Sequence, residues 1–187
     1  MIANEVAQHF KLSSAKTVPI YNGVDTRVFC PRQTWETFPW QVWIAGGVRD
    51  VRYRAALEAL VTELGLTDQV RWLGFVDEVE LVALYQGAKA FVTASRDEGF
   101  NIPPLEAMAS GCPVLCSDIP VHRELFDGAA LFFPAESSEA LAQGLLRLHD
   151  DVAQGEQLRQ QARLCVERLS WSAMARRVAT ALRTLRG

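Results

Sequence analysis

The chain has 187 residues, of which 49% are hydrophobic and 22% are charged, and its formal net charge is −3 at pH 7. This length and composition are typical of one globular domain, and the mild negative charge argues against a nucleic-acid binder, which is usually basic. No apolar run approaches the ~20 residues that cross a bilayer, and the N-terminus lacks the basic start and apolar core of a signal peptide. We therefore expect a cytoplasmic protein.

Hydrophobic periodicity predicts strands that alternate with helices along the whole chain. In the first half we expect a short helix at 2–10, a strand at 16–21, a loop at 30–40, a strand at 41–45, a helix at 53–64, a strand at 69–73 and a helix at 78–86. The apolar residues of the helix at 53–64 fall on one face, and Gly65 is expected to end the helix.

The second half continues the alternation. We expect strands at 89–93, 113–116 and 129–133, a helix after residue 101, a helical turn at 122–126, and helices at 138–149, 156–169 and 171–186. Ser137 is the predicted cap of the helix at 138–149. Most of the predicted strands are continuous apolar runs, which is typical of a parallel sheet covered on both faces. The predicted fold class is therefore α/β, a Rossmann-like doubly wound parallel sheet with helices on both faces.

The stretch Glu98–Val114, EGFNIPPLEAMASGCPV, is the most informative part of the chain. Gly99 and the bend that follows it mark the end of a strand and the start of a helix. Backbone N–H groups at such a place hold anionic ligands in α/β proteins. Glu98 falls in the loop and Glu106 about two turns into the helix. We expect both carboxylates to point toward the same crevice and to accept hydrogen bonds from hydroxyl groups.

This stretch resembles the donor-binding signature of the retaining GT-B glycosyltransferases of family 4, also called glycosyl transferases group 1. In that family a Glu is followed by seven residues and a second Glu, and Asn101 stands where Gly is usual. Four further segments resemble the same family: VPIYNGVD at 18–25, VWIAGG at 42–47, VRWLGFV at 70–76 and SDIPVHRE at 117–124. The resemblance covers nearly the whole chain, but it is to the C-terminal, donor-binding half of the enzyme, in a mannosyltransferase-like branch.

The resemblance implies a role for each matched residue. Glu98 would bind a hydroxyl of the donor sugar and act as the catalytic carboxylate, and Glu106 would bind the ribose. Backbone amides would face the diphosphate, glycines would let the chain pass close to the phosphates, and the loop after a strand would flank the base. The predicted donor-binding residues are Glu98, Gly99, Phe100, Asn101, Ile102, Glu106, Gly46, Gly47, Gly74 and Phe75. The family uses no metal or cofactor for this. GDP-mannose is the first expected donor and a UDP-sugar the second.

Two parts of the family pattern are absent. After the segment at 18–25, the family has a strand, a basic loop and a helix before the strand that VWIAGG resembles. Here only ten residues, Arg32–Gln41, separate Pro31 from Val42, so about one strand–helix unit of ~30 residues is missing. That unit carries the Arg and Lys that hold the diphosphate. Arg49 and Arg52 are the predicted substitutes, with Arg54 beside them.

The other absent part is the N-terminal domain that binds the acceptor in such enzymes. Residues 1–30 are interpreted as a remnant of the interdomain segment, and residues 31–187 as the nucleotide-sugar-binding domain. The expected activity is retaining hexose transfer, with mannose first, to a glycan or lipid-linked acceptor in a full-length or partnered enzyme for polysaccharide biosynthesis. The alternatives are a non-catalytic nucleotide-sugar-binding module and an inactive remnant.

Several other residues have ordinary structural interpretations. Cys30, Cys112, Cys116 and Cys165 form no CxxC pair and are expected to be reduced, mostly buried thiols rather than disulfides or metal ligands. Asp118 is the predicted cap of the turn that follows it. His122 has no accompanying nucleophile, so a catalytic role is the weaker alternative. Arginines on the last two predicted helices form a solvated face or, as the weaker alternative, a surface for peripheral association with the inner face of a membrane.

Overall fold

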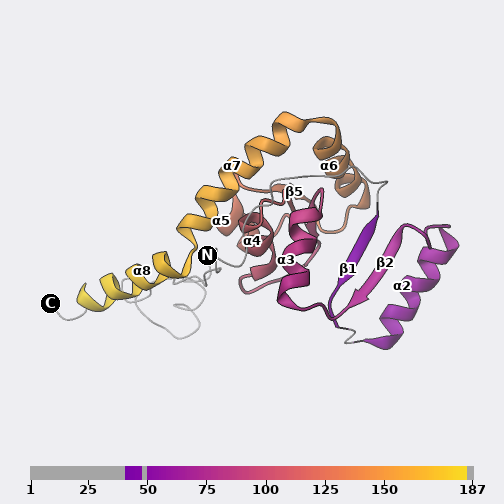
Figure 1. Ribbon diagram of the computed structural model, residues 1–187, viewed down its shortest axis with the longest axis horizontal. Helices are drawn as coiled ribbons and strands as arrows, with labels where there is room; N and C mark the ends of the chain where they lie inside the picture. Colours follow the sequence, from indigo (N-terminus) through magenta and orange to yellow (C-terminus); the bar gives the residue numbers. More distant parts are fainter. Residues whose placement is uncertain (1–40, 48–49, 185–187) are drawn as a thin grey trace.

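The structure is a computed structural model that describes residues 41–47 and 50–184 (Figure 1). The predicted helix at 2–10, the strand at 16–21, the remnant at 1–30 and Arg49 lie outside these residues. The strands are β1 (Val42–Ala45), β2 (Val70–Gly74), β3 (Phe91–Thr93), β4 (Val114–Ser117) and β5 (Leu131–Phe133). The helices are α2 (Val51–Glu63), α3 (Glu78–Gly87), α4 (Ile102–Ala109), α5 (Pro120–Phe126), α6 (Ser138–Asp150), α7 (Val152–Arg168) and α8 (Trp171–Thr184).

All strand pairs are parallel, and helices connect them, which confirms the predicted α/β fold class. The strands form two separate sheets, one with the order β1-β2 and one with the order β3-β4-β5. In the first sheet Val42 lies opposite Val70, and in the second Val92 lies opposite Leu115. The helices α2, α4 and α5 each connect one strand to the next parallel strand, as a Rossmann-like arrangement requires.

The break between the two sheets falls at a defined place in the doubly wound topology. Six strands of such a domain stand in the order 3-2-1-4-5-6. In this order β2 and β1 take the first two places, and β3, β4 and β5 take the last three. Within residues 41–47 and 50–184, no strand takes the place of the first strand, in the centre of the sheet. This is the place at which the sequence predicts a missing strand–helix unit, and the strands on either side do not pair with each other.

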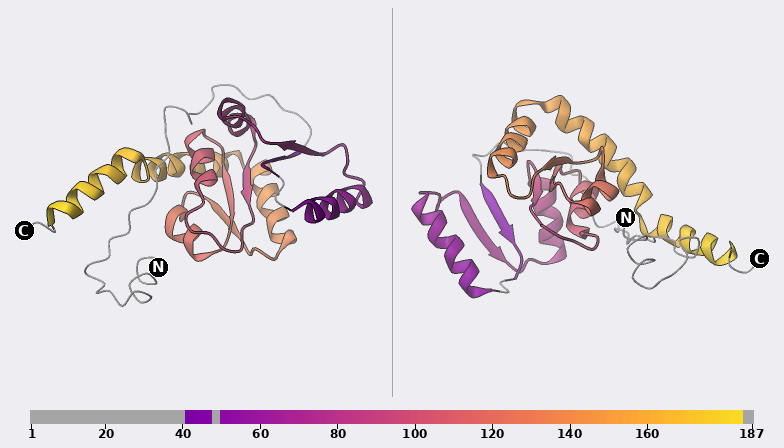
Figure 2. Two further views of the ribbon diagram at one scale, coloured as in Figure 1. Left: turned by 90° about the horizontal axis from the view of Figure 1, so that it is seen from below. Right: turned by 180° about the vertical axis from the view of Figure 1, so that it is seen from behind.

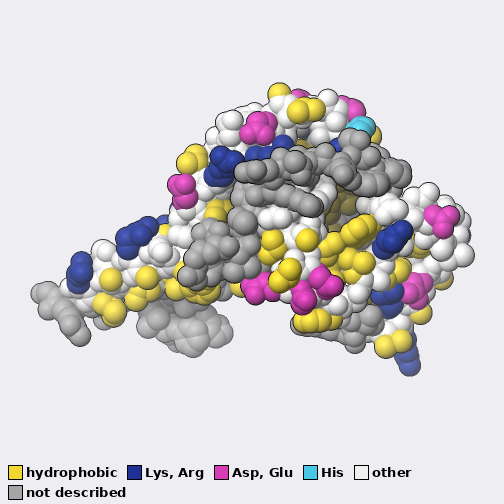
Figure 3. Space-filling view, viewed as in Figure 1, with side chains coloured by type: hydrophobic (Ala, Val, Ile, Leu, Met, Phe, Trp, Pro, Cys, Tyr) yellow, Lys and Arg dark blue, Asp and Glu magenta, His cyan; other side chains and the backbone are white. Residues whose placement is uncertain are grey.

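The strand beside the break has little cover. Val42 and Trp43 of β1 are 56% and 52% exposed, and α2 has no buried residue. The apolar face of α2 is therefore not buried in this structure. A helix buries its apolar stripe only against a neighbouring layer, and the two-stranded sheet offers a narrow one. Figure 3 shows hydrophobic side chains gathered on the surface over β1 and α3.

The core lies around β4 and the helices α4, α5 and α7. Leu105, Val114, Leu125 and Phe126 are fully buried there, and each such side chain stabilises the fold by about 1.5–3 kcal/mol. The helix α7 is also held by polar contacts, because Arg159 Nε donates to the carbonyl oxygen of Gly111 at 3.2 Å. The stable part of the domain is thus the second sheet with its helices, and it carries the Glu98–Val114 stretch.

The ends of the helices follow the capping rules. Ser137 accepts a hydrogen bond from the backbone N–H of Ala140, as predicted, and Gly65 ends α2 with a φ of +68°. The helix α7 begins earlier than predicted because Asp151 accepts from the N–H of Gln154. The helix α8 extends away from the rest of the domain in both views of Figure 2 and has no buried residue. None of the helices in the described ranges is long and apolar enough to span a membrane.

Candidate functional site

The predicted site residues lie where strands end and helices begin. Residues 94–101 connect β3 to α4, and Gly46 and Gly74 directly follow or end β1 and β2. The N–H of Gly46 donates to the carbonyl oxygen of Gly74 at 2.7 Å, so these two glycines are neighbours at the C-terminal edge of the first sheet. Both have positive φ values, +132° and +68°, which favour glycine. Phe75, which follows Gly74, is 87% exposed.

The first turn of α4 has few backbone N–H groups that could bind a ligand. Pro103 and Pro104 occupy the first turn of α4 and have no N–H. Asn101 precedes the helix with φ 66° and ψ 84°, and its side chain does not cap the helix. The amides at this position therefore belong to the residues from Gly99 to Ile102, in the turn itself. Phe100 is partly buried and packs against the core, as the sequence allows.

Glu98 is oriented by a neighbour in the same loop. Ser95 Oγ donates a hydrogen bond to Glu98 Oε1 at 2.8 Å, and Ser95 Oγ lies 3.4 Å from Thr93 Oγ1. The carboxylate has about four acceptor positions, and Ser95 uses one of them. Glu98 can accept further hydrogen bonds from a bound hydroxyl group.

Glu106 is held from the other side, by α3. Tyr85 donates from its hydroxyl group to Glu106 Oε2 at 3.2 Å. Burial raises the pKa of the Tyr85 phenol, and the negative charge of Glu106 raises it further, so the phenol keeps its proton. Burial also raises the pKa of Glu106, and the hydrogen bond from Tyr85 partly opposes this. Glu106 is thus a half-buried carboxyl group with one oxygen engaged.

Asn101 and His122 are in direct contact, although they are 21 residues apart. Asn101 Nδ2 lies 2.8 Å from His122 Nε2 and 3.2 Å from Thr93 Oγ1. On its other side, His122 Nδ1 lies 2.9 Å from the carbonyl oxygen of Ser117. His122 is fully buried. The ring therefore connects the turn before α4 to the end of β4 and has a structural position, which agrees with the first interpretation of this residue.

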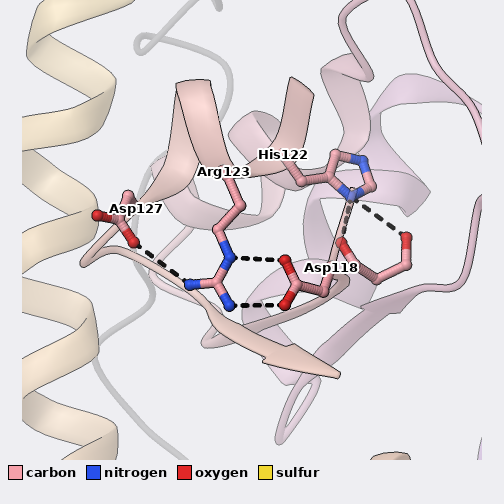
Figure 4. Close-up of polar contacts among 5 residues, drawn as sticks. Asp118, His122, Arg123 and Asp127 are labelled. Carbon is pink, nitrogen blue, oxygen red and sulfur yellow. Dashed lines mark hydrogen bonds and ion pairs between the residues drawn. The ribbon is translucent and has the colours of Figure 1, made fainter. Parts of the chain in front are cut away.

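The neighbouring Asp118 corrects one prediction. Asp118 does not cap α5, because the residue at the cap position is Ile119 and no side chain caps this helix. Instead Asp118 accepts two hydrogen bonds from Arg123, at 2.6 and 2.8 Å. Figure 4 shows Arg123 between Asp118 and Asp127, with His122 pointing away from them. A guanidinium group can engage both oxygens of a carboxylate, and this contact takes Asp118 away from the helix amides.

Three arginines were predicted to replace the family's diphosphate-binding Arg and Lys, and among the described residues Arg52 remains as the candidate. Arg54 forms an ion pair with Glu58 at 2.7 Å, and its guanidinium group lies 3.7 Å from the centre of the Trp72 ring. Arg49 lies outside the described residues. Arg52 is exposed in the first turn of α2, shortly after Gly46 and Gly47. Within residues 41–47 and 50–184, no group of three His, Cys, Asp or Glu side chains is placed to hold a metal ion.

Two hollows in the described part of the surface are not lined by the predicted donor-binding residues. One of about 280 Å³ lies between α5 and α7 and is lined by residues such as Glu124, Gln161 and Arg168. None of the predicted site residues lines it. Gly99 and Pro103, in contrast, are exposed on an open surface. Among the described residues, the predicted site therefore lies at an open edge of the domain.

Four contact residues of this site were not predicted from the sequence: Tyr85, Thr93, Ser95 and Ser117. Tyr85 falls within the predicted helix at 78–86, and the sequence assigns it no role in the site. The two hydroxyl residues Thr93 and Ser95 stand two positions apart at the end of a strand, so they lie on one face. That spacing next to Glu98 is the signal that could have found them.

Comparison with known proteins places this geometry in a family. Residues 31–165 match the model of the family described as glycosyl transferases group 1. The O-antigen chain mannosyltransferase RfbU of Salmonella typhimurium is 35% identical over 156 residues, which are 70% of this chain and 44% of that protein. The GDP-mannose:cellobiosyl-diphosphopolyprenol alpha-mannosyltransferase of Xanthomonas campestris is 41% identical over 81 residues, 43% of this chain and 21% of that protein. The chain thus spans less than half the length of these relatives.

A solved structure matches the domain itself. The C-terminal domain of a glycosyl transferase group 1 family protein, LpcC, from Francisella tularensis superimposes with a TM-score of 0.67 at 25% identity. The match covers 78% of this chain and 97% of that one. The fold is therefore similar to that of a C-terminal domain of this family.

Proposed function

Because the chain belongs to the glycosyl transferases group 1 family, we propose that its domain binds a nucleotide-sugar donor for glycosyl transfer with retention. The observation that carries the proposal is the arrangement around Glu98–Glu106. One carboxylate lies in the loop, a second lies on the following helix, and the turn from Gly99 to Ile102 lies between them. Each carboxylate is held by a hydroxyl donor, Ser95 or Tyr85, and keeps other acceptor positions for a ligand.

The proposed pose follows from the chemistry of each group. The amides of Gly99 to Ile102 face the diphosphate, since aligned N–H groups stabilise the charge that develops on a leaving group. Glu98 accepts a hydrogen bond from a hydroxyl of the donor sugar, which orients the anomeric carbon. Glu106 accepts from the ribose with the oxygen that Tyr85 leaves open. Gly46, Gly47, Gly74 and Phe75 border the nucleotide at the edge of the first sheet. Arg52 contributes positive charge near the phosphates.

GDP-mannose is the first proposed donor, and a UDP-sugar is the second. The relatives from Salmonella and Xanthomonas are both described as mannosyltransferases, and the second is described with GDP-mannose. The acceptor-binding half of the enzyme is a proposed partner that completes the site. The helix α8 offers it a surface, because Trp171, Met174 and Val178 recur at helical spacing and the described part of α8 has no buried residue.

Titration by calorimetry tests the binding proposal directly. The purified chain is titrated with GDP, GDP-mannose, UDP and UDP-glucose, and the same is done with Glu106→Ala. We expect the chain to bind one nucleotide and its sugar, and the variant to bind it at least tenfold more weakly. If no nucleotide binds at millimolar concentration, the chain is an inactive remnant and the proposal fails.

A second experiment separates a catalytic half from a binding module. The described residues supply no central strand and leave Arg52 as the candidate for holding the diphosphate, so we expect no sugar transfer by the chain alone. Radiolabelled sugar transfer is measured with the chain alone and after addition of a separately produced acceptor-binding domain. Transfer that requires the added domain supports the proposal, and binding without transfer in the mixture favours the non-catalytic module.

Anionic vesicles added to the chain test the weaker alternative of peripheral membrane association, with co-sedimentation as the readout.

A further inference from the structure

Asn101 has an unusual backbone conformation for its residue type. It is the only non-glycine residue with a positive φ in the described part of the chain. A left-handed conformation is disfavoured for residues with a side chain, although Asn tolerates it better than most. Some contact has to hold Asn101 in this state. Its side chain does not cap α4, so the usual explanation for an Asn before a helix does not apply.

Two side chains hold Asn101 in place. Its amide nitrogen lies 3.2 Å from Thr93 Oγ1 and 2.8 Å from His122 Nε2. An amide nitrogen can only donate, so Nε2 of His122 has to accept. Nδ1 then carries the ring proton and donates it to the carbonyl oxygen of Ser117 at 2.9 Å. His122 is therefore a neutral ring, fully buried, with both nitrogens engaged.

The same contacts continue to Glu98. Thr93 Oγ1 accepts from Asn101, which leaves the Thr93 hydroxyl hydrogen for Ser95 Oγ at 3.4 Å. Ser95 in turn donates to Glu98 Oε1 at 2.8 Å. From Asn101 to Glu98 the donors point in one direction, so these bonds polarise one another. The bond from Asn101 to the buried ring of His122 points the other way, so Asn101 is the donor that connects the ring to this series.

We propose that Asn101 and His122 are positioning residues that fix the turn before α4 and, through Thr93 and Ser95, the carboxylate of Glu98. This rests on the proposed function, because it assigns a purpose to the turn whose amides face the diphosphate. A glycine would adopt the positive φ of this position without strain. Asn101 is instead held in that conformation by its hydrogen bond to His122. The turn is held rigid by a side chain anchored on β4 and α5.

Amide hydrogen exchange tests the positioning role without any ligand. Exchange at residues 99–102 is measured in the full chain and in Asn101→Ala, Asn101→Gly and His122→Phe. We expect exchange at these amides to be about tenfold faster in Asn101→Ala and His122→Phe, with residues 114–117 of β4 unchanged. His122→Gln, which keeps an acceptor for Asn101, is expected to be affected least. Unchanged exchange at 99–102 in Asn101→Ala overturns the proposal, whether or not His122→Phe folds.

Nucleotide affinity then tests the consequence for binding. Both Asn101→Gly and Asn101→Ala lose the side-chain bonds, but only glycine adopts a positive φ without strain. We expect the affinity for the nucleotide to decrease from wild type to Asn101→Gly to Asn101→Ala, and Asn101→Gly to improve binding in the His122→Phe background. Equal affinities of Asn101→Ala and wild type would refute the link to binding. If the wild-type chain binds no nucleotide, the proposed function fails, while the exchange experiment still decides the positioning role.

Discussion

Replacement of Glu106 by Gln separates the binding role of this residue from its effect on stability. The amide oxygen of Gln can still accept the hydrogen bond from the Tyr85 hydroxyl group, so the local packing is retained. The substitution removes the negative charge that would accept hydrogen bonds from the ribose hydroxyl groups. A hydrogen bond to a charged group contributes about 1.5–3 kcal/mol, which corresponds to about 10- to 100-fold in affinity. We expect Glu106→Gln to weaken nucleotide binding by this factor in calorimetric titration.

The same substitution is expected to stabilise the unliganded protein at neutral pH. Burial raises the pKa of Glu106 above its ordinary value, so the folded state binds this proton more tightly than the unfolded state does. The wild type therefore loses stability as the pH rises through the folded pKa, and Glu106→Gln does not. The difference in unfolding free energy between the two proteins is expected to be largest at pH 7. It should vanish below the ordinary Glu pKa of about 4.3.

A matched control is Glu78→Gln. Glu78 lies at the start of α3, and its charge raises the pKa of Glu106 but makes no contact with the proposed ligand. We expect this variant to keep its nucleotide affinity. Two results would refute the reasoning: nucleotide affinity of Glu106→Gln within twofold of wild type, or a stability difference that grows as the pH falls. The first result would show that Glu106 does not bind the ribose. The second would show that the folded state does not raise the pKa of Glu106.

Two further predictions concern the core. Gly155→Ala in α7 is expected to raise the free energy of unfolding by about 0.5–1 kcal/mol through its higher helix propensity, and so to raise Tm, because an added Cβ would lie 3.7 Å from its nearest neighbour, Arg159 Nη1. Gly144→Ala in α6 is expected to lower stability by about 1 kcal/mol or more, since its Cβ would lie 2.7 Å from the buried Leu115 Cδ2; equal Tm shifts in the two variants would contradict this. Burial raises the pKa of Cys112 and of Cys116 to about 12, so a Cys30→Ser variant is expected to react with a thiol reagent at pH 8 only after unfolding. Rapid reaction of the native variant would show that these thiols are accessible.

Local signals in the sequence predicted the elements that depend on local physics. Ser137 before an apolar stripe predicted the start of α6, and Gly65 predicted the end of α2, because a cap or a positive φ is decided within one turn of chain. The turn around Gly99 was predicted for the same reason. The buried, reduced state of Cys112, Cys116 and Cys165 is also as predicted.

The contacts that the sequence did not predict join distant segments. Periodicity predicted the apolar face of α2, but it does not show whether a neighbouring layer exists to bury that face, and α2 has no buried residue. Asp118 was expected to cap α5. It binds Arg123 instead, because a guanidinium group that engages both carboxylate oxygens binds more strongly than a helix amide does. Tyr85 with Glu106, and His122 with Asn101, pair across 21 residues each, and neither spacing is visible in a single sequence.

The most direct test of the proposed function is an NMR titration that locates the nucleotide on the domain. Backbone amide signals of the chain are recorded while GDP, and separately UDP, is added to millimolar concentration. We predict that the signals of Gly99, Phe100, Asn101 and Ile102 shift with saturation, and that Glu106→Ala weakens the effect. Shifts confined to the hollow between α5 and α7, or no shifts at all, would contradict the claim that this turn is the donor site.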